Sequence, residues 1–149
     1  MELNEKFNII FYNRGVGGFI TDELGTNDLS YPDIPIAQMI DHYDQILCQV
    51  KAALPDVKLY LMAYYPINYD AATEEMKPCL LVRTNQKIAE ANAAVKKLAE
   101  KHHAKYIDIN DPLKDENGNL KAEYTIEGMH IKEEGYRAIF PEFIRYAME

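Results

Sequence analysis

Glu127 and His130, near the end of the sequence, are the residues best suited by type and spacing to do chemistry. They lie in the stretch 124–136 (YTIEGMHIKEEGY), with the flexible Gly128 between them and a helix-like pattern directly after. A carboxylate this close can fix the tautomer of the imidazole, and a positioned imidazole is a common general base in acyl transfer. Taken alone, the pair fits a surface histidine without a function equally well.

Two glycine-rich segments could stabilise an oxyanion beside such a base. Residues 13–18 (NRGVGG) follow a short apolar run, and glycines there let backbone N–H groups turn toward an oxyanion or a phosphate. Residues 25–28 (GTND) carry Asn27, whose side-chain amide can donate a hydrogen bond. Both segments also fit ordinary turns. The segment 13–18 also leaves open a protein that binds phosphate or a nucleotide, although Ile20 replaces the third glycine of the dinucleotide-binding motif.

A general base needs a nucleophile, and the sequence contains a single serine, Ser30. Cys48 falls in an apolar-periodic stretch, and Cys79 follows a proline in an expected loop; neither has a recognisable partner base. Two cysteines form no disulfide framework, and no Cys/His spacing indicates zinc. The sequence therefore predicts no metal and no cofactor, and it leaves the nucleophile unassigned.

Composition narrows the class of protein. The chain has 149 residues and a formal net charge of −8, which favours one domain over residues 1–149 and argues against a nucleic-acid partner. Its longest apolar run, residues 59–67, is too short to span a membrane. The first residues contain no apolar signal segment, so we expect a cytoplasmic protein.

The elements that must position these residues alternate between strands and helices. Apolar runs predict strands at 7–12, 57–64 and 105–108, and 3.6-residue periodicity predicts helices at 36–54, 84–103 and 132–148. This alternation predicts an α/β fold built of βαβ units around a parallel sheet. The connection 66–83 is long enough to be functional. The last helix is expected to pack through five apolar residues: Tyr136, Ile139, Phe140, Phe143 and Ile144.

In this order, the segments resemble the SGNH or GDSL-like family of esterases and lipases. Residues 13–18 look like its second block, 25–28 like its third, and 127–131 (EGMHI) with 135–136 (GY) like its last block, normally Asp-Gly-x-His-Leu. The resemblance covers nearly the whole chain. It implies a flavodoxin-like three-layer α/β/α sandwich with the site at the carboxyl ends of the strands. It also implies a carboxylic ester hydrolase that works through an acyl-enzyme on a small ester, with acetylated carbohydrate as one candidate substrate.

By the same resemblance, four residues would form the site. The backbone N–H of Gly18 and the side-chain amide of Asn27 would make the oxyanion hole. His130 would be the general base, oriented by Glu127. Glutamate replaces the family's aspartate here, a change that the flexible Gly128 can accommodate and that other hydrolase folds also use.

The sequence departs from the family pattern in two places. The opening Gly-Asp-Ser block, which supplies the nucleophile, is absent. Gly18 and Asn27 are only nine positions apart, where the family inserts a helix and a strand. Two strands are thus missing, one before residue 1 and one between residues 24 and 25. The sequence could be part of a longer chain, a truncated or internally deleted product, or a chain whose sheet a partner copy completes in a homo-oligomer. The alternative function is then a catalytically inactive relative that serves as a binding or interaction module.

Overall fold

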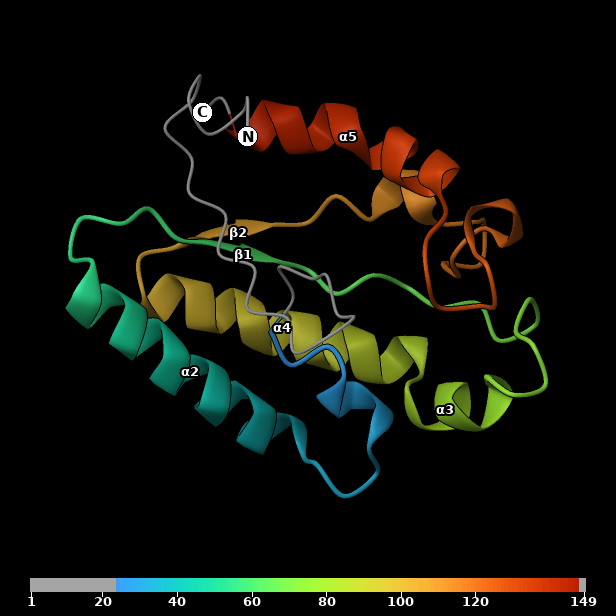
Figure 1. Cartoon of the computed structure of the whole chain (residues 1–149), viewed down its shortest axis with the longest axis horizontal. Helices are drawn as coiled ribbons and strands as arrows, with labels where there is room; N and C mark the ends of the chain where they lie inside the picture. The colour runs from blue at the N-terminus through green and yellow to red at the C-terminus, as the bar shows by residue number, and fades with distance from the viewer. Residues whose placement is uncertain (1–23, 148–149) are drawn as a thin grey trace.

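Two short parallel strands form the centre of the structure, which is a computed structural model that describes residues 24–147. Strand β1 (Tyr60–Met62) pairs with β2 (Lys105–Ile107), with Leu61 opposite Tyr106. Helices α2 (Ile36–Ala53) and α4 (Asn85–Lys101) lie on one side of the strands and α5 (Glu133–Ala147) on the other (Figure 1). The expected α/β architecture with a parallel sheet is confirmed.

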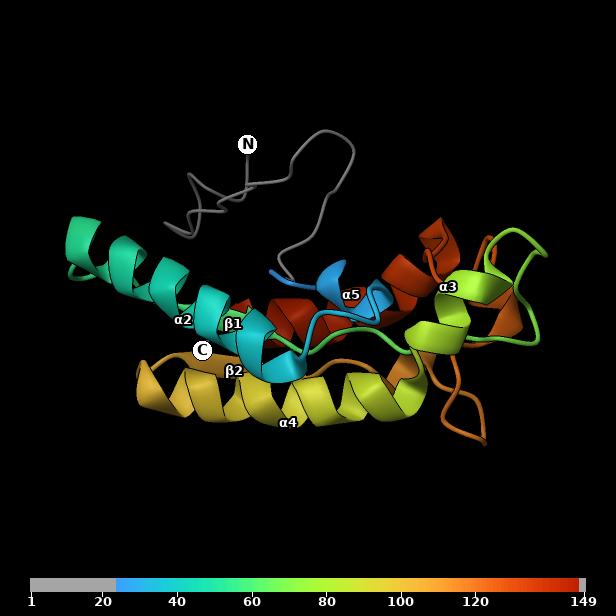
Figure 2. The ribbon, with the colours of Figure 1, turned by 90° about the horizontal axis from the view of Figure 1, so that it is seen from below.

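The strands separate two hydrophobic cores because successive side chains of a strand point to opposite faces. Leu61 packs into the core shared with α2 and α4, and Met62 packs into the core shared with α5. Figure 2 shows α2 and α4 side by side, and both helices contribute buried residues to the first of these cores. The buried face of α4 is the one that its periodicity predicted: Ile88, Ala91, Val95, Leu98 and Ala99.

The helices begin and end close to their predicted positions. Thr84 caps α4 as expected, since its side-chain oxygen accepts a hydrogen bond of 3.1 Å from the backbone N–H of Lys87. A short helix that the sequence did not predict, α3 (Lys77–Val82), lies inside the connection 66–83. Its six residues are too few to show a helical period, and Pro78 occupies its first turn. The remaining turns of helix are of the 3-10 type: η1 (Asp28–Ser30), η2 (Asp111–Leu113) and η3 (Ala122–Tyr124).

Strand β1 is shorter than its apolar run because side chains replace a neighbouring strand beyond Met62. Asn92 of α4 pairs with the backbone of Tyr64: its Oδ1 accepts from the N–H at 2.7 Å and its Nδ2 donates to the C=O at 3.1 Å. Asn85 makes the same pair of bonds with Ile67, at 2.8 and 2.9 Å. These two amides satisfy backbone groups that would otherwise be buried without partners.

The expected packing of α5 is partly wrong. Ile139 is buried and Phe143 packs beside it, but Tyr136 and Phe140 are exposed. Positions 136 and 140 lie one turn apart on a face directed away from the sheet, whereas 139 and 143 share the face that covers it. The apolar character of Tyr136 and Phe140 was therefore not enough to predict that they are buried.

Within residues 24–147, β1 and β2 are the only strands of the sheet. The strand predicted at 7–12 and the segment 13–18 lie outside the described residues. Among the helices of the described part, none is long and apolar enough to cross a membrane.

Candidate functional site

The loop that carries His130 is closed by the hydroxyl of Thr125. This hydroxyl oxygen accepts a hydrogen bond of 2.8 Å from the backbone N–H of Gly128 and donates one of 3.0 Å to the C=O of His130. Thr125 also pairs with Ile131 in an antiparallel bridge. Since Thr125 is buried, these bonds are shielded from water and hold the loop in one shape.

Gly128 is required at the centre of this loop. Its φ of +96° lies in the left-handed region, and a Cβ at this position would approach the backbone oxygen of Asn68 to 2.5 Å. The space is tight because the N–H of Asn68 donates to the C=O of Gly128 at 2.7 Å. The start of the connection 66–83 thus fixes the position of the loop.

Glu127 and His130 are brought together as predicted. One carboxylate oxygen of Glu127, Oε1, lies 2.6 Å from Nδ1 of the His130 ring and accepts a hydrogen bond of 3.0 Å from its backbone N–H. Glu127 is 14% exposed at its side chain, and His130 is 60% exposed. When Nδ1 donates to the carboxylate, the neutral ring carries its lone pair on Nε2. The arrangement can present a proton acceptor to a molecule in solution.

Asn27 lies on a separate tight turn. The N–H of Asp28 donates to the C=O of Gly25 at 3.0 Å, and Gly25 has a φ of +86° with Met39 packed against it. Asn27 precedes η1, and its side chain makes no capping bond to that turn. Within the described part, no hydrogen bond links Asn27 to Glu127 or His130. Gly18, the other predicted member of the oxyanion hole, lies outside the described residues.

Arg83 is a residue of this region that the sequence did not reveal. Its buried guanidinium donates to the backbone oxygen of Thr26 at 2.6 Å and to the Thr26 hydroxyl at 2.7 Å. The hydroxyl of Tyr64 adds a bond of 2.6 Å to the C=O of Leu24. The segment that leads into Asn27 is therefore anchored at Leu24 and at Thr26. A single arginine after an apolar run carries no sequence signal of such a contact, 57 positions away.

A cavity of about 510 Å³ opens between α4 and the end of β2, and it is lined by neither Asn27 nor His130. Burial raises the pKa of Tyr106, which lines it, above the ordinary value for tyrosine. Asn110, also in the lining, donates from Nδ2 to the C=O of Tyr64 at 2.9 Å. This cavity is not the place where the Glu127–His130 pair would act.

The described residues form an α/β fold with a parallel sheet, and comparison with known proteins gives the family. Residues 7–138 match the GDSL-like Lipase/Acylhydrolase family, so the chain belongs to it. In fold it is similar to a protein from Streptococcus pneumonia that is described as a platelet activating factor, with a TM-score of 0.74 and 29% identity over 84% of this chain. It is similar to a GDSL-like lipase from Bacteroides thetaiotaomicron, with a TM-score of 0.66 and 21% identity over 85% of the chain.

Among curated proteins, the sequence is similar to the GDSL esterase/lipase WDL1 of Oryza sativa subsp. japonica. The two are 22% identical over 120 residues, and these residues make up 79% of this chain. The match covers 46% of the rice protein, and the two structural matches cover 57% and 60% of theirs. The chain thus spans about half the length of these relatives. The resemblance to the SGNH and GDSL-like hydrolases is confirmed as membership of the family and as a shared fold.

Proposed function

We propose that this chain hydrolyses carboxylic esters, with His130 as the general base and Glu127 as the residue that orients it. One observation carries the proposal: a single oxygen of Glu127 holds both the ring Nδ1 and the backbone N–H of His130, while the ring itself is 60% exposed. The exposed ring leaves Nε2 accessible to a substrate. Membership of an acylhydrolase family supports the same reaction.

The chemistry follows from the lone pair on Nε2. By the family's mechanism, that nitrogen would take the proton of a nucleophilic hydroxyl, which is not assigned to a residue of this chain, as the hydroxyl oxygen bonds to the ester carbonyl carbon. It would then return the proton to the leaving alkoxide. The side-chain amide of Asn27 and the backbone N–H of Gly18 would stabilise the oxyanion between these steps. A water activated by the same base then hydrolyses the acyl-enzyme. We propose a small ester with a short acyl group as the substrate, and acetylated carbohydrate is one candidate.

A second candidate function is favoured by a specific feature of the sequence. The family's Gly-Asp-Ser block is absent, and Ser30 lies in the 3-10 turn η1 after Asn27, where the family has no nucleophile. A chain that keeps the base but lacks its nucleophile can retain the scaffold as a binding or interaction module. The two candidates differ in whether the chain turns over an ester.

Turnover of p-nitrophenyl acetate separates the candidates. We expect the chain to release many equivalents of p-nitrophenol, and His130→Ala to lower the rate roughly 100-fold or more, the usual contribution of a general base. His42→Ala, which removes an exposed histidine of α2, is the matched control and should leave the rate unchanged. Repeated turnover must be measured because the exposed thiol of Cys48 could be acetylated once. Equal rates for wild type and His130→Ala contradict the assigned base, and no turnover above buffer favours the binding module.

A further inference from the structure

A second group of chemically reactive side chains lies between α2 and α4. Asp44 and Cys48 are four positions apart on α2, so they share one face of that helix. His102 follows the last residue of α4 and is only 7% exposed. One ligand atom from each residue, a carboxylate oxygen, the thiol sulfur and a ring nitrogen, lies within 4.8 Å of the other two.

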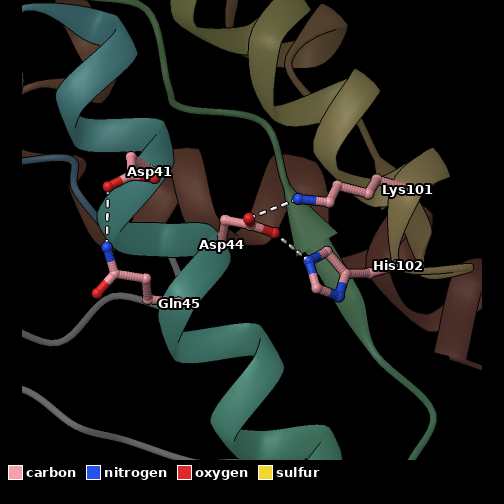
Figure 3. A network of polar contacts seen from close by, with 5 residues as sticks. All are labelled: Asp41, Asp44, Gln45, Lys101 and His102. Carbon is pink, nitrogen blue, oxygen red and sulfur yellow. Dashed lines mark hydrogen bonds and ion pairs between the residues drawn. The ribbon is translucent and has the colours of Figure 1, made fainter.

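Asp44 is the centre of this group (Figure 3). Its Oδ1 lies 2.5 Å from Nε2 of His102, and its Oδ2 lies 2.5 Å from the Nζ of Lys101. Hydrogen bonds from Lys101 and then from His102 hold the pKa of the Asp44 carboxyl below its ordinary value. Asp44 is therefore an anion at neutral pH, and one of its two oxygens already faces the imidazole.

We propose that Asp44, Cys48 and His102 form a binding site for a divalent metal ion of the zinc type. Zinc is bound in proteins by carboxylate, thiolate and imidazole ligands, and three protein ligands leave the fourth tetrahedral position to water. Ligand atoms at about 2.0–2.3 Å from zinc are roughly 3.3–3.8 Å apart. The observed spacings, from 2.5 Å between Asp44 Oδ1 and His102 Nε2 up to at most 4.8 Å, bracket this range, and the ion would take the place of the proton between Asp44 and His102.

The charges of the group suit a divalent cation. The Asp44 carboxylate and the Cys48 thiolate, once its proton has passed to solvent, supply two negative charges. Lys101 can keep its bond to Oδ2, because the metal needs only the Oδ1 that faces His102. Lys51 bonds the backbone oxygen of His102 and so helps to hold the histidine against α2.

The position of the group separates it from the pair proposed for ester hydrolysis. It lies where α4 ends, whereas the loop that precedes α5 lies at the other end of the molecule (Figure 1). A metal here would tie α2 to α4, two helices that pack side by side. The sequence did not predict it, because an aspartate and a cysteine four positions apart are not a zinc motif by themselves, and the third ligand follows 54 positions after Cys48.

Titration with Co²⁺ tests the site, since a cobalt–thiolate bond gives a charge-transfer absorption that carboxylates and imidazoles lack. The full chain is first treated with EDTA and kept reduced with a phosphine. We expect saturation at one equivalent with that absorption, displacement of cobalt by Zn²⁺, and a higher melting temperature with Zn²⁺. Cys48→Ser should remove the absorption and weaken Zn²⁺ binding at least tenfold, and Asp44→Asn should weaken it similarly.

Cys79→Ser is the matched control, since Cys79 is the other free cysteine and lies outside the group. It should bind Co²⁺ as the wild type does. Absence of saturable binding to the wild type, or an absorption that survives in Cys48→Ser, would overturn the proposal. Cys48 is exposed, so its serine variant should fold, and an unchanged circular dichroism spectrum verifies this. Ester turnover before and after EDTA should be equal, which keeps this test independent of the hydrolase proposal.

Discussion

The described part of the chain contains two histidine–carboxylate pairs, and they differ in exposure and in origin. His130 and Glu127 come from one short loop, and the ring is 60% exposed while the carboxylate is 14% exposed. His102 and Asp44 come from the end of α4 and from α2, and the ring is 7% exposed while the carboxylate is 21% exposed. In the first pair the ring is more exposed than the carboxylate, and in the second pair the carboxylate is more exposed than the ring.

The difference shows that a hydrogen bond between imidazole and carboxylate does not by itself define a role. A general base must reach its substrate, so its ring has to be accessible while its orienting carboxylate is held. A buried ring between two helices stabilises their packing, and it can serve as a metal ligand if other donors converge on it. Mutations should therefore affect activity at one pair and stability at the other.

The largest effect is expected from Glu127→Gln. The amide can donate where the carboxylate accepted, so the His130 ring is no longer held with its proton on Nδ1, and kcat for p-nitrophenyl acetate should fall by about 10²- to 10⁴-fold. Glu123→Gln, an exposed glutamate of the neighbouring turn η3, should keep the wild-type kcat. If both variants hydrolyse the ester equally well, Glu127 has no orienting role.

The exposed pair could be predicted from the sequence because its members are three positions apart and linked by a glycine. The long helices were also predictable, since each has an apolar stripe that must be buried. The bond from Arg83 to Thr26 and the Asp44–His102 pair join positions more than 55 apart, and only the fold brings them together. Helix α3 was missed because six residues show no clear period.

The buried pair should dominate stability. His102→Ala removes a partner of Asp44 and leaves a small cavity between α2 and α4, so it should lower the free energy of unfolding by about 1–3 kcal/mol. His130→Ala removes an exposed ring and should change the free energy of unfolding by less than about 0.5 kcal/mol. Urea denaturation of the two variants measures both values. A larger loss for His130→Ala than for His102→Ala would reverse the assignment of the pairs.

A comparison of two glycines tests how the exposed pair is held in place. Gly128→Ala forces a Cβ to within 2.5 Å of the Asn68 backbone oxygen, while Gly118→Ala, with a similar φ of +81°, meets nothing within 4 Å. Both variants pay roughly 1–2 kcal/mol for the left-handed backbone. Gly128→Ala should cost more than this in thermal unfolding and should also slow ester turnover. Gly118→Ala should cost only the backbone strain and should leave turnover unchanged. Equal costs would show that the loop tolerates displacement.

The tautomers of the two rings test the central comparison most directly. In a long-range ¹H–¹⁵N correlation spectrum at alkaline pH, where imidazole is neutral, each ring nitrogen is distinguished by its proton. The structure predicts that His130 carries its proton on Nδ1 and its lone pair on Nε2, whereas His102 carries its proton on Nε2, facing Asp44. A His130 ring protonated on Nε2 would contradict its assignment as a general base held by Glu127.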